Sequence, residues 1–229
     1  GHATLQFQSV SGGSANTGQA TIGSFNESSG SKATVLSFGT RQNSDSTVRE
    51  RMRINSDGRL LIGSTAVRNV GGSSATAQLQ IEGTTGNNSS LALIRNQNNT
   101  GGAFIRFSKS RGSSNGAVTT VADGDVLGSM TFSGADGTDL ENATAQIKAL
   151  VNGTVAGNQI PTDITFETSV NTGGNRSEKM RILSSGGITF NGDTATANSL
   201  HDYEEGTWSP SGFCDGGSLN SNEATYTKI

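Results

Sequence analysis

Acidic side chains are the main source of acid–base chemistry in this 229-residue sequence, with 19 Asp and Glu against 2 His and 1 Cys. Two carboxyl groups about 5 to 9 Å apart can cleave a glycoside, one as acid and the other as base or nucleophile. The candidate pairs are Asp123 with Asp125, Asp136 with Asp139, and Glu204 with Asp202 or Glu205. The first two pairs lie in glycine-rich turns, where Asp usually bonds the local backbone. We therefore assign no catalytic residue.

Histidine and cysteine are too few to build a site by themselves. A Ser-His-Asp triad would have to use His201, because we attribute His2 to a tag remnant at residues 1–2. Asp202 is adjacent, but neighbouring side chains on a strand point to opposite faces, so we interpret His201 as a solvated residue. Cys214 is alone and cannot form an intrachain disulfide or a structural zinc site. We expect no bound metal and no cofactor.

Two aromatic residues near the end of the chain are the candidates for glycan contact. Tyr203 and Trp208 lie in a ten-residue stretch that holds the single Trp and one of the two Tyr. Aromatic rings stack on sugar faces, which makes this stretch a candidate glycan-binding site. The alternative, which we favour, is that Trp208 packs at a junction between two structural parts.

Charged and apolar residues alternate on two related stretches, 50–63 and 178–191. This period of two, interrupted by a Ser/Asp/Gly turn, predicts a β-hairpin in each stretch. The charges could form a patch for acidic sugars, a solvated face, or salt bridges that hold neighbouring chains in register. We favour the last, with a worth of about 0 to 1 kcal/mol per surface pair. The residues assigned to this role are Glu50, Arg51, Met52, Arg53, Ile54, Glu178, Met180, Arg181 and Ile182.

The two hairpins close two longer repeat units. Residues 34–43 match residues 162–171 at the same offset of 128, and Leu5 and Phe7 match Met130 and Phe132 at an offset of 125. Each unit is predicted to contain three strands and a hairpin, and internal repetition is a strong guide to architecture. We divide the chain into a tag remnant (1–2), repeat unit 1 (3–66), a connecting β segment (67–127), repeat unit 2 (128–192), and a junction with the start of a C-terminal domain (193–229).

Short strands are also predicted between the units. They are expected at residues 78–81, 91–94 and 104–107, separated by Asn-, Thr- and Gly-rich loops. Residues 140–150 alternate as a further strand, and residues 194–199 suggest a helical turn or a connector. No convincing helical period occurs, so the sequence predicts an all-β fold.

Composition argues against a chain that buries its own core. Glycine accounts for 32 of 229 residues, and only 31% of residues are hydrophobic. Such a chain has little apolar surface to offset its conformational entropy, which favours a core completed by other copies of the chain. The net charge of -3 gives no footprint for nucleic acid, and no apolar run is long enough to insert in a membrane.

These motifs together resemble tail fibre and tailspike proteins of tailed bacteriophages. The resemblance covers most of the chain and rests on Glu-Arg-Met-Arg-Ile with Leu-x-Ile-Gly at 50–63, on the strand at 128–138, and on Asp-Tyr-Glu-Glu-Gly-Thr-Trp-x-Pro at 202–210. The chain departs from the pattern at His201, where a second acidic residue is common, and at Phe190-Asn191, which replaces Ile-Gly. The His-x-His pair with which some such fibres bind iron is absent.

The resemblance implies a segment of fibre shaft that precedes a C-terminal tip or chaperone domain. We expect an all-β, elongated, intertwined homotrimer of short strands and hairpins, located in the virion and extracellular. Its expected partners are other tail or fibre proteins and, through a tip region, a host surface glycan or protein receptor. The alternatives are a glycan-degrading tailspike and a carbohydrate-binding bacterial surface adhesin. We expect a structural protein with a role in host attachment and no enzymatic activity.

Overall fold

The computed structural model describes residues 2–10, 17–27, 32–42, 46–72, 76–170 and 176–200, and the backbone of residues 204–208 and 224–228. The described part is built from β-strands, with two single-turn 3-10 helices, η1 (Gly86–Asn88) and η2 (Thr196–Asn198). The prediction of an all-β fold is therefore confirmed. The chain separates into two compact units, Gly1–Ile105 with Ser133–Asn142, and Arg106–Phe132 with Ala143–Ile229.

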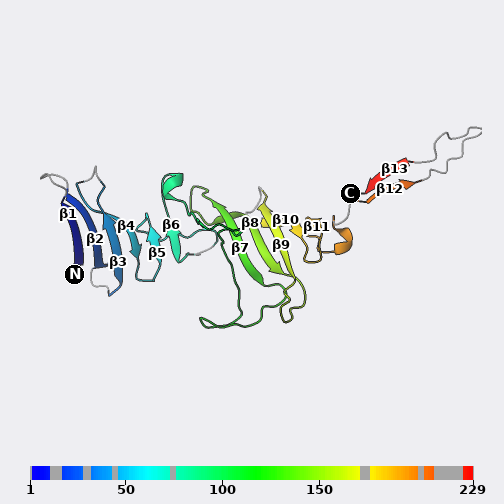
Figure 1. The fold of residues 1–229 in the computed structure, drawn as a ribbon, viewed down its shortest axis with the longest axis horizontal. Helices are drawn as coiled ribbons and strands as arrows, with labels where there is room; N and C mark the ends of the chain where they lie inside the picture. Colours follow the sequence, from blue (N-terminus) through cyan, green and yellow to red (C-terminus); the bar gives the residue numbers. More distant parts are fainter. Residues whose placement is uncertain are drawn as a thin grey trace, which may run out of the picture. The chain divides into compact units, whose positions relative to one another are not determined.

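The first sheet has six strands in the order in which they occur along the chain (Figure 1). Its members are β1 (His2–Val10), β2 (Thr17–Asn26), β3 (Thr34–Thr40), β4 (Arg49–Ile54), β5 (Leu60–Ile62) and β6 (Leu79–Ile81). Neighbours are antiparallel from β1 to β5, and β6 joins β5 in parallel. Short polar turns suit this meander, because an antiparallel pair needs only a tight connection.

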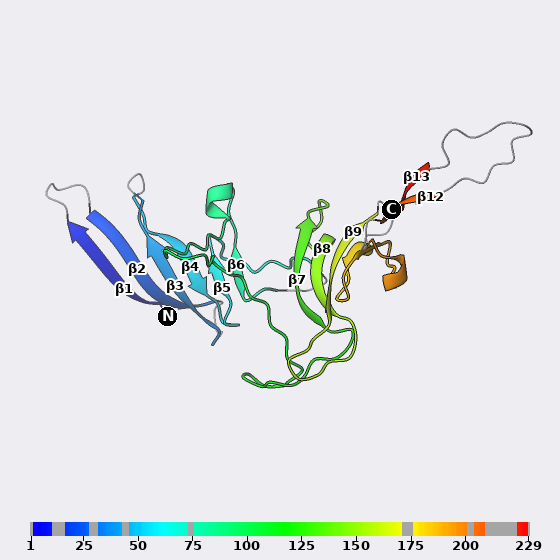
Figure 2. The same ribbon diagram turned by 45° about the vertical axis from the view of Figure 1, so that its right-hand side comes forward.

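The second sheet has five strands, again with sequence neighbours paired, and Figure 2 shows β7, β8 and β9 side by side. Its members are β7 (Val126–Gly134), β8 (Asn142–Val151), β9 (Thr162–Ser169), β10 (Arg176–Ile182) and β11 (Ile188–Phe190). The backbone of β12 (Glu204–Trp208) pairs with that of β13 (Ala224–Lys228) in a separate two-stranded sheet. The predicted hairpins are confirmed as β4–β5 and β10–β11, and the strand expected at residues 140–150 as β8.

Residues 128 apart occupy equivalent places in the two sheets. Phe38 pairs with Met52 in the first sheet, and Phe166 pairs with Met180 in the second. Both strand pairs also carry a β-bulge, which places Arg51 in the first sheet and Lys179 in the second as the extra residue. A bulge reverses the alternation of side chains beyond it, so it decides which charges share a face.

The connection between β6 and β7 differs from the prediction. Residues 78–81 do contain a strand, β6, but residues 91–94 and 104–107 take part in no ladder within this chain, and the whole of 82–125, which the structure describes throughout, is free of strand. Every residue from 83 to 109 is exposed. The strands predicted at residues 91–94 and 104–107 are therefore wrong for the single chain, because neither stretch joins a ladder of the described residues.

Few apolar side chains are buried. The buried hydrophobic residues of the described part are Val35, Leu61, Val121, Val151 and Leu183. This small core agrees with the low apolar content of the sequence, since a chain of this length normally buries many more.

Two glycines near the β4–β5 hairpin offer a test of the parallel β5–β6 pairing. Both have positive φ, +77° at Gly58 and +79° at Gly63. A Cβ on Gly58 would meet nothing within 4 Å, whereas one on Gly63 would lie 2.2 Å from the carbonyl oxygen of Glu82. Gly58→Ala should lower the free energy of unfolding by about 1 to 2 kcal/mol, the backbone cost alone. Gly63→Ala should cost about 1 to 3 kcal/mol more, because the β6 backbone must move.

The midpoint of urea unfolding, measured for both variants and the parent, checks this difference. Equal midpoints for Gly58→Ala and Gly63→Ala would contradict the close approach of β6.

Candidate assembly surface

One face of the first sheet is apolar across all six strands. Backbone pairing aligns a continuous row of side chains: Leu5, Ile22, Phe38, Met52, Ile62 and Ile81. A second row contains Leu36, Ile54, Leu60 and Leu79. Alternate residues of a strand share a face, so β3, β4, β5 and β6 each contribute to both rows. Phe7 on the same face of β1 is 51% exposed, which shows that this chain does not cover the surface.

The second sheet repeats this apolar face. One row contains Ile147, Phe166, Met180 and Phe190, and the next contains Ala149, Ile164, Ile182 and Ile188. At the outer strand Phe190 is 49% exposed, and Ile182 is 41% exposed. We refer to these two surfaces as the apolar faces.

The opposite face of the second sheet is polar and more deeply buried. Asp163 and Thr165 are fully buried, Thr189 is 1% exposed and Arg181 is 7% exposed. Burial without a partner would be costly for such groups, so each charge must be compensated locally. The usual arrangement of a sheet, with apolar residues inside and polar residues outside, is therefore reversed within a single chain.

Arg181 is the centre of the buried polar network. Its Nη1 donates to Asp163 Oδ2 at 2.7 Å, while its Nε and Nη2 donate to the two carboxylate oxygens of Glu178 at 2.8 and 2.6 Å. Asp163 also accepts hydrogen bonds from the backbone N–H of Ser184 at 2.8 Å and from Asn152 Nδ2 at 2.7 Å. The network links β9 to β10, to the turn after β10 and to Asn152, the residue that follows β8, so it fixes the register of β9 and β10.

The hydrogen bonds of this network shift the acidity of its members. Burial by itself would raise the pKa of Asp163, but hydrogen bonds from Arg181, Ser184 and Asn152 together lower the pKa below its usual value. The pKa of Arg181 is raised, chiefly by the hydrogen bonds to Glu178. Both groups are therefore held in their charged forms.

The first sheet contains the related pair Glu50 and Arg53. Arg53 Nη2 donates to Glu50 Oε2 at 2.9 Å, and Nη1 donates to the Thr65 carbonyl at 3.2 Å. Val35 occupies the place equivalent to Asp163, and the Arg53 guanidinium lies 5.3 Å from the centre of the Phe25 ring instead. This Arg is thus satisfied by a carboxylate, a carbonyl and an aromatic face.

The bulge explains why these charges pair within one chain. Residues three apart on a regular strand point to opposite faces, but the extra residue Arg51 or Lys179 brings Glu50 beside Arg53 and Glu178 beside Arg181. Strict alternation would place Arg51 on the same face as Arg53, but the bulge puts the two side chains on different faces. Its Nε donates to Thr40 Oγ1 at 3.2 Å. That these charges also set the register between chains stays a prediction.

The sequence does not by itself predict that Asp163 is fully buried. The repeat aligns Asp163 with Val35, an apolar residue of the first unit. This alignment fits a buried position for Asp163 but does not indicate its polar partners. A carboxylate at a buried strand position needs a cation opposite it, and Arg181 is the neighbour that supplies one.

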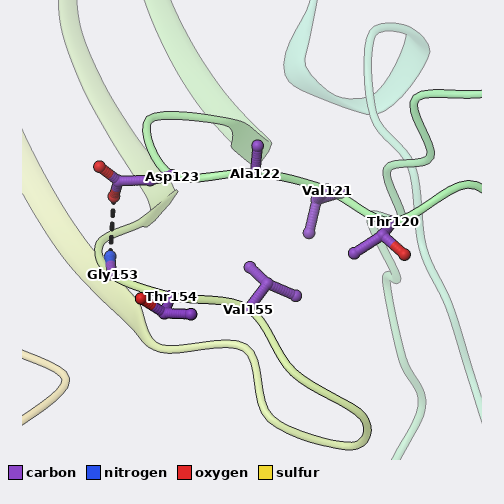
Figure 3. Close-up of a pocket in the computed structure, with 7 residues that line it drawn as sticks. All are labelled: Thr120, Val121, Ala122, Asp123, Gly153, Thr154 and Val155. Atoms are coloured by element: carbon purple, nitrogen blue, oxygen red, sulfur yellow. Dashed lines mark hydrogen bonds between the residues drawn. The ribbon is translucent and has the colours of Figure 1, made fainter.

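A cleft lies beside the end of β8 in the second unit (Figure 3). It has a volume of about 350 Å³ and is lined by Thr120, Val121, Ala122, Asp123, Gly153, Thr154 and Val155. Asp123 Oδ1 accepts a hydrogen bond from the Gly153 backbone N–H at 2.7 Å, as the dashed line shows. The carboxylate therefore ties a loop to the turn after β8.

The other candidate carboxylates also bond nearby groups. Asp125 accepts two hydrogen bonds from Arg111, at 2.8 and 2.9 Å, and its pKa is strongly lowered by them. Asp136 accepts from the backbone N–H of Thr138 at 2.8 Å, which lowers its pKa too. A general acid in glycoside cleavage needs a raised pKa, which is the opposite shift.

The remaining predicted site residues cannot be placed by their side chains. Tyr203, His201 and Asp202 lie outside the described residues, and Trp208 belongs to β12, of which the structure describes the backbone alone. Within the described part of the chain, no three His, Cys, Asp or Glu side chains gather where they could hold a metal ion. None of its helices has the length and apolar content to cross a membrane.

Two solved structures share this arrangement of strands. One is the carboxy-terminal domain of the bacteriophage T5 L-shaped tail fibre, with a TM-score of 0.66 and 11% identity over 96% of this chain and 88% of that one. The other is the same domain with its intra-molecular chaperone domain, with a TM-score of 0.55 and 10% identity over 96% of this chain and 60% of that one. This chain has a phage tail fibre-like β-fold. No family model and no curated protein matches the sequence.

Replacing Asp163 by Asn should expose the role of the buried network. Asp163→Asn leaves Arg181 paired with Glu178 alone, so the free energy of unfolding at pH 7 should fall by about 3 kcal/mol. Asp57→Asn, in the exposed pair of Asp57 with Arg59, should have a smaller effect. Urea unfolding of the two variants measures the difference.

Lowering the pH should remove the stabilisation that the ionised Asp163 gives to the parent protein. Because the folded-state pKa of Asp163 lies below the unfolded value of about 3.9, the stabilisation is present above that pH and is lost as the pH falls below it. Asp163→Asn should therefore lose less stability than the parent between pH 6 and pH 3. Parallel losses in the two proteins would contradict this assignment.

Proposed function

We propose that this chain is a structural segment of a phage tail fibre that functions as a homotrimer and supports attachment to a host cell. The observation that carries the proposal is the reversal of burial: apolar faces lie exposed while charged groups on the other side of the second sheet are buried. Sheets with a broad apolar face require a cover, and the tail fibre-like fold favours copies of the same chain as that cover.

Three copies satisfy the geometry simply. Three sheets arranged around one axis can each turn an apolar face inward, so every copy covers part of its neighbours and is covered in turn. Such closure also protects strand edges such as β1 and β6, which single sheets leave open. Each copy would carry its own Arg–carboxylate network on the other side of the sheet.

Finer parts of the proposal concern position and partners. We assign the segment to the shaft, with host contact made through a tip and with other tail or fibre proteins as partners. Tyr203 and Trp208 remain the candidates for a glycan contact. Of the residues assigned to register, Met52, Ile54, Met180 and Ile182 lie on the apolar faces, so these are the candidates for contacts that set the register between chains.

Adjacent residues on β1 provide a matched test of the trimer. Phe7 belongs to the apolar face, and Gln6 lies on the opposite face of the same strand. Phe7→Asp should weaken the trimer, because it places a charge in a surface that the copies cover, whereas Gln6→Asp should not. Light scattering coupled to gel filtration should give three times 23.5 kDa, about 70 kDa, for the parent and for Gln6→Asp.

A parent protein that elutes as a single folded chain at micromolar concentration would refute the trimer. Equal masses for Phe7→Asp and Gln6→Asp, both trimeric at nanomolar concentration, would refute the apolar face as its interface.

The structural role also predicts the absence of glycan cleavage. The full chain, incubated with host capsular polysaccharide or lipopolysaccharide, should release no new reducing ends, since Asp125 and Asp136 have lowered pKa values. A colorimetric assay for reducing ends, with a known glycosidase as positive control, measures this. Release that increases with protein concentration would favour the glycan-degrading alternative.

A further inference from the structure

The exposed segment, residues 91–107, combines a sequence typical of a buried strand with an exposed setting. Leu91, Ala92, Leu93 and Ile94 form a continuous apolar run, so both faces of a strand built from them would be apolar. This pattern is typical of a strand covered on both sides. In one chain, however, Leu91 is 65% exposed and Ile94 is 81% exposed.

The second half of the exposed segment shows the same mismatch. Ile105 is 65% exposed and Phe107 is 55% exposed, although both are large apolar side chains. The trace between β6 and β7 carries no strand arrow here (Figure 1). Apolar surface of this extent on a described, continuous stretch normally marks an interaction site.

The turn between the two halves is fixed by its own hydrogen bonds. Arg95 Nε donates to Gln97 Oε1 at 3.1 Å, and Arg95 Nη1 donates to the Gly102 carbonyl at 3.2 Å. Asn99 Oδ1 accepts from the Gly101 backbone N–H at 3.0 Å. The segment is therefore shaped before it meets a partner, which reduces the entropy lost when it docks.

The surface area of the chain shows how much must be covered. A chain of 23.5 kDa exposes 16504 Å² here. A folded monomer of this mass exposes about 9,800 Å², and two separate folded bodies that share the mass expose about 11,800 Å². The excess is several times the ~800 Å² that each partner contributes to a standard interface. Copies of the chain that bury such an excess must share more than one small contact.

We propose that residues 91–107 form strands that are completed by neighbouring copies of this chain, which supply the ladder partners and the apolar cover. The inference rests on the proposed trimer and names a segment through which its chains interlock. The occupant is a second copy, because the same sequence leaves both the exposed segment and the apolar faces uncovered and holds Arg95 in its own turn, away from the apolar run. A chain that exchanges strands in this way joins its neighbours by backbone bonds as well as by side chains.

Hydrogen exchange of the assembled full chain tests the proposal directly. Peptides that cover residues 91–95 and 104–108 should exchange at least about 100-fold more slowly than the free-chain rate, as amides in a ladder do. Peptides from β8 and β9 provide the protected reference. If the parent is trimeric but residues 91–107 exchange at the free-chain rate, the inference fails while the trimer stands.

Two charge substitutions test whether a neighbouring copy covers the apolar run at residues 91–94. Ile94→Asp should raise the dissociation constant of the assembly at least about tenfold, whereas Thr100→Asp in the turn should leave it unchanged. Analytical ultracentrifugation over a dilution series measures both. An assembly equally stable in Ile94→Asp and Thr100→Asp would overturn the proposal. Should Ile94→Asp fail to fold, the exchange rates of the parent still decide.

Discussion

The structure depends on one constraint: each sheet must bury a broad apolar face, and the described residues of one chain leave that face exposed. The rows that begin at Leu5 and Ile147 run from strand to strand without interruption, whereas the buried hydrophobic residues of the described part are few and scattered. Apolar burial is the dominant favourable contribution to folding, at roughly 25 cal/mol per Å². A chain that leaves this contribution unused must obtain it by association, so folding and assembly are coupled in the proposed trimer.

The polar network on the other side of the second sheet has a different task. Removing charges from water costs several kcal/mol for each ion, and a buried ion pair often only balances that cost. The Arg181 network is thus a poor source of net stability, but it is highly selective. Moving β10 by one residue along β9 would separate Arg181 from Asp163, leaving the buried carboxylate without its cation and Arg181 with Glu178 alone. The same shift would turn Met180 and Ile182 away from the apolar face, so the network and the apolar pattern specify the same register.

The sequence predicts the strands well because the alternation of Met52 with Ile54, and of Met180 with Ile182, is a local property that the sheets retain. It predicts the placement of charges less well. A bulge is a pairing feature, and neither Arg51 nor Lys179 has a side chain that signals an extra residue in the strand. The role of Asp163 is not predictable for a similar reason, since its partner Arg181 is 18 residues away and becomes its neighbour only after β9 and β10 pair.

Residues 91–107 show that a sequence can indicate a strand without indicating which strand pairs with it. Residues 91–94 have the composition of a strand, but a ladder needs a second strand, and this chain provides none there. A period of two identifies what a segment can become and not which chain completes it. The same logic accounts for the low hydrophobic content of 31%. Since each apolar side chain in a trimer contributes to a shared core, a chain can assemble with fewer of them than a monomer of the same length needs.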